Sequence, residues 1–61
     1  MKLYEILNEK TLPVLVQDKD GKIWKVLDSD SSGFHAVIKD APVEYLQIKT
    51  LSYQASGYEL L

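Results

Sequence analysis

Two short apolar-rich runs separated by Asp20-Gly21 are the clearest feature of the hydrophobic pattern. Both lie within residues 13–28, PVLVQDKDGKIWKVLD. Alternation of apolar and polar residues is typical of a strand, and Asp-Gly between two such runs is a strong signal for a β-hairpin. The pattern therefore predicts two antiparallel strands joined by a tight turn at Gly21.

A three-residue loop over 19–21 is the hairpin register that keeps the apolar side chains together. In this register Gly21 supplies the positive φ of a bulge, and Asp18 pairs with Lys22. Because side chains alternate along a strand, four apolar residues then share one face, namely Val14, Val16, Trp24 and Val26. A two-residue loop would separate this set, so we expect the three-residue loop.

The opposite face of the hairpin is also half apolar. It carries Leu15, Gln17, Ile23 and Lys25. We therefore expect something to cover part of this face as well. A strongly bent sheet or a small open barrel would bury more of both faces than a flat sheet.

The first residues have helical rather than strand spacing. Leu3, Ile6, Leu7 and Lys10 recur as on one face of a helix, which predicts a short amphipathic helix over 2–10. A helix of this length is not stable alone in water, so we expect it to dock on the sheet.

The segment after the hairpin is less regular. The polar stretch DSDSSG, residues 28–33, predicts a loop, and residues 34–39 predict a third strand. Residues 43–51 alternate in the manner of a strand. The alternative for this last stretch is a helix that begins at Asp40 as its N-cap.

A second loop over 52–57 and a short last strand over 58–61 complete the predicted elements. Together they predict an α+β fold over residues 1–61, as one small domain. The expected architecture is a short N-terminal helix packed on a small, strongly bent antiparallel sheet or open barrel of four to five strands.

Composition argues against several functions. The chain has seven Lys and no Arg, nine Asp plus Glu, no Cys and a net charge of −2. Arg supplies the bidentate contact to phosphates and guanine edges, so its absence argues against nucleic-acid binding. Without Cys there is no disulfide and no thiolate metal site. We find no signal peptide and no apolar run that could span a membrane, and we expect a cytoplasmic protein.

Residues 28–33 also resemble the first half of an EF-hand calcium loop. Asp28, Asp30 and Ser32 stand where the loop has oxygen ligands, and Gly33 follows them. The similarity fails where the loop needs a bidentate Glu, because that position is Lys39. We therefore expect no calcium, and no other metal or cofactor.

Catalysis has little support in the sequence. His35 is the only histidine, and no nucleophile-elbow motif accompanies it. We expect His35 to be a half-exposed surface residue, and we expect no enzyme activity.

The tyrosines suggest a binding surface. Four Tyr in 61 residues are more than a small core needs, and Tyr is enriched at protein interfaces. The last run, 57–61, carries one charge and would form a poorly guarded edge strand. We expect the partner-binding residues to be Tyr45, Tyr53, Tyr58 and Leu60. The alternative is that the tyrosine rings lie at the rim of the core with their hydroxyls in water.

By elimination, the sequence predicts a small non-catalytic protein-binding module, an adaptor or inhibitor, that binds another protein or itself. Lys without Arg would suit an A+T-rich genome, such as that of a low-G+C bacterium or its phage. The alternative function is a small-barrel nucleic-acid-binding protein that uses Trp24, Tyr45 and lysines for stacking and backbone contacts.

Overall fold

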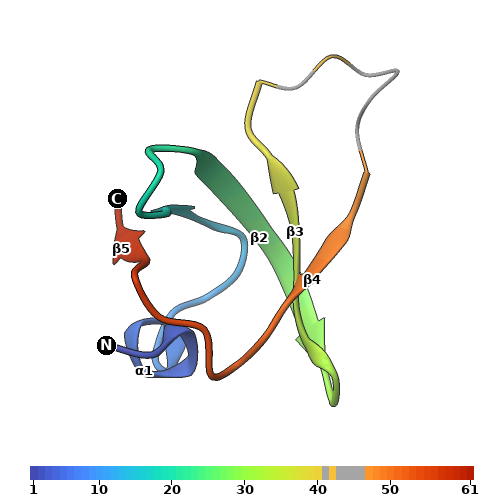
Figure 1. Cartoon of the computed structure of the whole chain (residues 1–61). Helices are drawn as coiled ribbons and strands as arrows, with labels where there is room; N and C mark the ends of the chain where they lie inside the picture. The colour runs from blue at the N-terminus through green and yellow to red at the C-terminus, as the bar shows by residue number, and fades with distance from the viewer. Residues whose placement is uncertain (41, 43–46) are drawn as a thin grey trace.

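The computed structural model describes residues 1–40, 42 and 47–61. Within them it has one helix, α1 (Leu3–Leu7), and five strands: β1 (Val14–Gln17), β2 (Ile23–Asp30), β3 (Gly33–Ile38), β4 (Lys49–Leu51) and β5 (Glu59–Leu60). The strands form one antiparallel sheet in the order β4-β3-β2-β1-β5 (Figure 1). The sheet is not closed into a barrel. The predicted fold is therefore confirmed in outline, as a small β-rich domain with one short helix.

The predicted register of the first hairpin is confirmed. Val16 lies opposite Trp24, and Val14 lies opposite Val26. The Asp18 amide donates to the Lys22 carbonyl at 2.9 Å. Gly21 has a φ of 87°, the left-handed conformation that the three-residue loop requires.

The loop predicted over 28–33 is wrong except at Ser31 and Ser32, because β2 continues through Asp30 and β3 begins at Gly33. The polar side chains of this stretch form hydrogen bonds within the β2–β3 hairpin. Asp28 bonds to His35 across the strands, and the Asp30 carboxylate accepts from both the backbone and the hydroxyl of Ser32. Composition alone cannot distinguish such a polar strand end from a loop.

A register shift follows Val26 in the pairing of β2 with β3. The shift is a β-bulge, which adds a residue on one strand and turns the side chains beyond it. It leaves Phe34 buried on the core face while Asp28 and His35 pair on the opposite face. The polar end of β2 therefore joins the sheet without burying its carboxylates.

The N-terminal helix is shorter than the predicted span 2–10. It has no side-chain cap at Lys2, and its first amides are instead satisfied from a distant segment. Leu3 donates to the carbonyl of Ala55 at 2.6 Å, and Tyr4 donates to that of Tyr53 at 3.1 Å. The helix ends at Leu7, because the exposed polar residues that follow it have no apolar face to bury.

The core lies between α1 and one face of the sheet. Its buried members are Leu3, Leu7, Val16, Trp24, Val26, Phe34, Ala36 and Leu51. Leu3, Val16 and Val26 are fully buried, and each such side chain contributes about 1.5–3 kcal/mol by leaving water. The helix therefore docks on the sheet as predicted.

The remaining strands agree with the sequence where the structure describes them. The predicted strand 34–39 is β3, and the predicted last strand 58–61 is β5, which pairs with β1. Of the predicted strand 43–51, β4 forms the end. Residues 43–46 lie outside the described residues, and so does the choice there between strand and helix.

Two glycines offer a matched test of this fold. Gly21 and Gly33 both have positive φ, but a Cβ on Gly21 would make only an ordinary contact with the Gln17 side chain, whereas one on Gly33 would collide with the Leu51 carbonyl oxygen. We expect Gly21→Ala to lower the free energy of unfolding by about 1–2 kcal/mol. Gly33→Ala should lower it by a further ~1–3 kcal/mol, because β4 must move away from β3. Urea unfolding of both variants measures the difference, and equal losses would contradict the close approach.

Candidate functional site

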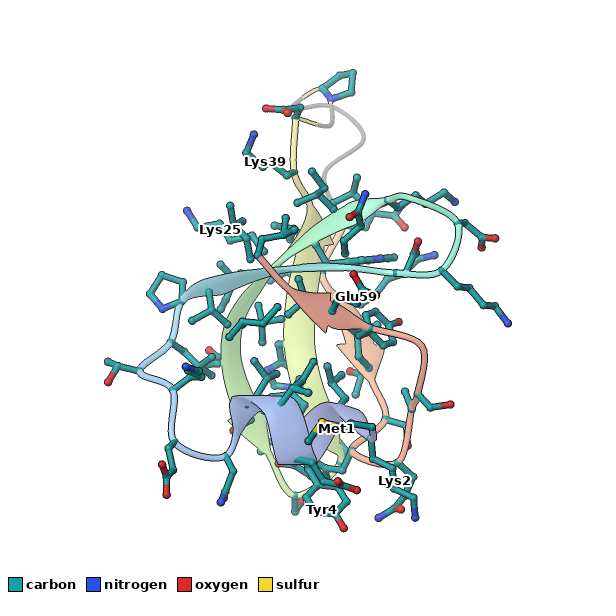
Figure 2. All side chains as sticks on the ribbon, turned by 90° about the vertical axis from the view of Figure 1, so that its left-hand side faces the viewer. Met1, Lys2, Tyr4, Lys25, Lys39 and Glu59 are labelled. Carbon is teal, nitrogen blue, oxygen red and sulfur yellow. The ribbon has the colours of Figure 1, made fainter. Side chains whose placement is uncertain are left out.

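Exposed apolar side chains gather beside β5, at one edge of the sheet. Met1 is 76 % exposed and Leu60 is 38 % exposed. Both line a hollow of about 400 Å³ together with Ile6, Tyr58 and Glu59. We call these five residues the β5 surface. Figure 2 looks onto this side of the molecule, with Met1 beside α1 and Glu59 on β5.

The β5 surface exists because β5 is the last strand in the sheet order. On one side β5 pairs with β1, where Leu60 lies opposite Val16 and Glu59 lies opposite Gln17. Its other side has no strand neighbour among the described residues. Backbone N–H and C=O groups along such an edge can pair with another chain.

The four residues predicted to bind a partner do not all lie together. Leu60 and Tyr58 line the same hollow, but Tyr53 does not. Tyr53 packs edge-on against Phe34, with the ring centroids 4.8 Å apart, and its hydroxyl donates to the carbonyl of Asp30. These contacts give Tyr53 a structural role in the fold. Tyr45 lies outside the described residues.

Tyr58 connects the β5 surface to the first hairpin. Its ring is half-buried against the core. Burial raises the pKa of the Tyr58 hydroxyl, and the nearby negative charge of Asp18 raises it further. Tyr58 therefore stays neutral at physiological pH.

Asp18 organises the loop between β1 and β2. One carboxylate oxygen accepts from the amides of Asp20 and Lys22, both at 2.9 Å, and the other accepts from the Trp24 indole at 3.0 Å. The Trp24 bond, followed by these backbone bonds, lowers the pKa of Asp18. The Lys49 amine lies 5.7 Å from the Trp24 ring centroid. Trp24 itself belongs to the core and is only 6 % exposed.

His35 lies between two carboxylates on the face of the sheet opposite α1. Its Nδ1 is 2.6 Å from Asp28, and its Nε2 is 3.1 Å from Asp30. Both contacts are hydrogen bonds only when both ring nitrogens carry protons. The pKa of Asp30 is lowered, chiefly by the bonds it accepts from Ser32. Because the Ser32 hydroxyl donates to Asp30, it is not arranged as a nucleophile activated by His35.

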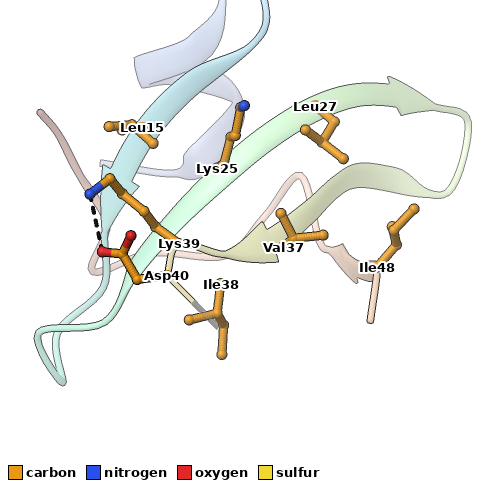
Figure 3. A pocket seen from close by; sticks show the side chains of 8 residues that line it. All are labelled: Leu15, Lys25, Leu27, Val37, Ile38, Lys39, Asp40 and Ile48. Atoms are coloured by element: carbon orange, nitrogen blue, oxygen red, sulfur yellow. Dashed lines mark hydrogen bonds and ion pairs between the residues drawn. The ribbon is translucent and has the colours of Figure 1, made fainter. Parts of the chain in front are cut away.

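A second hollow lies on this opposite face, which we call the outer face. It measures about 590 Å³ and is lined mainly by apolar side chains, with Lys25, Lys39 and Asp40 among them (Figure 3). The apolar members are Leu15, Leu27, Val37, Ile38 and Ile48, of which Val37 is buried and Ile38 also packs against the core. The Lys39 amine pairs with the Asp40 carboxylate at 3.1 Å. The outer face is therefore more apolar than the first hairpin alone suggested.

Comparison with protein-family models, with curated proteins and with solved structures finds no match. Among the described residues, no helix has the length and apolar character needed to cross a membrane. In the same part of the chain, no set of three or more acidic, His or Cys side chains is placed to hold a metal ion. The fold and the two hollows define a small β-rich domain with two apolar surfaces.

The pKa of Asp18 predicts an acid sensitivity of the hairpin. A carboxyl whose pKa falls below its ordinary value of 3.8 on folding stabilises the fold above that value. This stability is lost as the pH falls through the lowered pKa. An Asn at position 18 has one acceptor oxygen instead of two, so it can accept either the loop amides or the Trp24 N–H but not both. We therefore expect Asp18→Asn to have a lower melting temperature at neutral pH and a flatter acid dependence. Melting followed between ~pH 7 and ~pH 2 tests this, with Asp20→Asn as the control. Parallel curves for wild type and Asp18→Asn would contradict it.

A calcium titration tests the half EF-hand resemblance. Asp28 and Asp30 both face His35, and the second carboxylate also accepts from Ser32. We expect ~1 mM calcium to leave the melting temperature and the amide spectrum of residues 28–33 unchanged, because two carboxylates engaged in this way make a poor calcium site. A saturable shift confined to Asp28 and Asp30 would show that the site binds calcium.

Proposed function

We propose that this protein is a non-catalytic protein-binding module that binds its partner through the β5 surface. The observation that carries the proposal is the hollow beside an edge strand, lined by Met1, Ile6, Tyr58 and Leu60. Exposed apolar patches beside polar surroundings are typical of protein-interaction sites. A domain of this kind acts as an adaptor or as an inhibitor.

An extended segment of another protein is the partner that this geometry suits. Such a segment can add to the free edge of β5 by main-chain hydrogen bonds, as in β-augmentation. One of its apolar side chains would enter the hollow against Ile6 and Leu60. Tyr58 and Glu59 also line the hollow, and their side chains carry groups that can make polar contacts. Backbone pairing would then supply affinity, and the hollow would select the side chain.

The nucleic-acid alternative has less support from the geometry. It depends on Trp24 and Tyr45 as stacking residues, and base stacking needs an accessible ring face. Trp24 is buried, its indole N–H is bound to Asp18 and Lys49 lies over its ring. Tyr45 lies outside the described residues. Opening the core to expose Trp24 would remove one of the largest buried side chains from it.

An enzymatic role also has little support. His35 is held by two carboxylates, and the hydroxyl of Ser32 is engaged by one of them. General base catalysis requires a base within reach of the proton it removes and free to accept it. The His35 cluster therefore fits a strand-pairing role in the β2–β3 hairpin.

Leu60→Glu should weaken partner binding without unfolding the domain. Leu60 is partly exposed at the hollow, so a charge there would be desolvated by an incoming apolar side chain. A photoreactive side chain at Glu59 would first identify the partner in a lysate of the native host. Calorimetric titration with the purified partner should then show an affinity loss of about tenfold or more for Leu60→Glu.

Ile48→Glu is the matched control, because it places the same charge at an exposed apolar residue on the outer face. Its affinity per site for the purified partner should equal that of wild type. Equal affinities for Leu60→Glu and wild type would show that the partner binds elsewhere. Failure of the photoreactive side chain to capture any protein would count against the proposed function itself.

A further inference from the structure

The backbone of Leu60 faces the open edge of the sheet. Along two antiparallel strands, residue pairs that exchange both backbone hydrogen bonds alternate with pairs that exchange none. The Leu61 amide donates to the carbonyl of Leu15 at 3.1 Å, so these two residues form a pair of the first kind. Leu60 lies opposite Val16 in the next pair, which is of the second kind. The N–H and C=O of Leu60 therefore point away from β1, and no described strand lies on that side.

Side chains along β5 divide between the two faces of the sheet. Leu60 shares the face of Val16, which is fully buried in the core. Glu59 and Leu61, one position to either side, belong to the outer face. A residue that paired with Leu60 from the open edge would point its side chain to the same face as Leu60, where the hollow of the β5 surface lies (Figure 2).

Glu59 is the charged residue of β5. It is exposed, and no described cation lies within ion-pair distance of its carboxylate. A second carboxylate directly opposite Glu59 on an added strand would be destabilising, whereas a Lys or Arg there would form a favourable cross-strand pair. Glu59 therefore discriminates between the strands that could add to this edge.

We propose that the segment bound at β5 is an antiparallel strand whose three central residues are apolar, apolar and basic, in this order from its N-terminus. The first residue lies opposite Leu61, the second pairs with Leu60 and enters the hollow, and the third lies opposite Glu59. The antiparallel direction is the one that every strand pair of this sheet has, and it gives the more stable pairing.

This inference rests on the proposed function and adds the direction and the chemistry of the bound segment. β5 is only two residues long, so an added strand gains few main-chain hydrogen bonds, chiefly the two at Leu60. Selectivity then depends on the side chain in the hollow and on the charge opposite Glu59. A short peptide with this order of residues is therefore a sufficient probe of the site.

Three five-residue peptides with blocked ends test the order of residues. The first is Thr-Ile-Leu-Lys-Thr, the second has the reversed order Thr-Lys-Leu-Ile-Thr, and the third, Thr-Ile-Leu-Glu-Thr, replaces the lysine by glutamate. Each is titrated into the isotope-labelled protein and followed by NMR. We expect the first peptide to shift the amides of Leu60 and Ile6 saturably. The other two should have dissociation constants about threefold or more higher. Equal binding of the three peptides, or tighter binding of the reversed one, would overturn the proposal.

A charge exchange at Glu59 tests the pairing directly. In Glu59→Lys the preference should reverse, so that the glutamate peptide binds more tightly than the lysine peptide. Glu9→Lys makes the same change of charge at an exposed residue outside the β5 surface and should keep the wild-type preference. An unchanged preference in Glu59→Lys, or no saturable shift with any peptide up to ~5 mM, would contradict strand addition at this edge.

N-methylation of single amides, introduced by chemical synthesis of the chain, tests which backbone groups are free. At Leu60 it should leave the melting temperature unchanged and weaken binding of the lysine peptide about threefold or more, because it removes the outward N–H. At Leu61 it should lower the melting temperature, because this amide donates to Leu15. Undiminished peptide binding after methylation at Leu60, or equal losses of melting temperature at the two positions, would refute the proposed pairing.

The proposed function has a separate test, the affinity of Leu60→Glu for the purified partner. If that affinity falls while the peptide experiments fail, the partner uses the β5 surface without adding a strand in this direction. If that affinity equals the wild-type value, the proposed function itself fails.

Discussion

The hydrogen bond from the Trp24 indole to the Asp18 carboxylate ties the loop of the first hairpin to the side chain around which the core forms. It joins the loop between β1 and β2 to the largest side chain of the central strand. Because the other carboxylate oxygen accepts two loop amides, the loop geometry and the inward orientation of Trp24 are set together. Alternation then places Val16 and Val26 beside Trp24, and every later strand follows the same division into faces.

This division leaves a small protein with more apolar surface than its own chain covers. A chain of 61 residues buries only about 60 % of the surface that its unfolded form exposes. One short helix covers one face, and apolar side chains remain on the outer face and beside β5. A protein of this size gains stability when a partner covers such surfaces, since whatever binds the folded state alone stabilises it. Any partner that bound these surfaces would therefore also stabilise the fold.

Local sequence signals were sufficient where one physical requirement decided the structure. Asp20-Gly21 and the alternating apolar residues predicted the first hairpin and its register, because slipping by one residue would break the apolar set. Residues 28–30 were misjudged, since the bonds that hold Asp28 and Asp30 in a strand involve His35 and Ser32 across the hairpin. The span of α1 was overestimated for a similar reason, because its amides are satisfied by Tyr53 and Ala55.

The candidate site was predictable in part. Leu60 and Tyr58 were expected at an edge strand, and they line the hollow beside β5. Met1 and Ile6 were missed. Their position beside β5 depends on how α1 docks, and no local sequence pattern predicts that docking. Tyr53 was included among the predicted binding residues because of the high number of tyrosines in the sequence. Its packing against Phe34 became visible only with the strands in place.

The contact between the start of α1 and residues 53–56 has a consequence for how the chain folds. Lys2 forms an isolated β-bridge with Ser56, so the helix is anchored to a segment near the opposite end of the sequence. Closing so long a loop costs more entropy than closing a local hairpin. We therefore expect the hairpins β1–β2 and β2–β3 to form before α1 docks on the segment between β4 and β5. The hollow lined by Met1 and Ile6 would then be completed only when the two ends of the chain have come together.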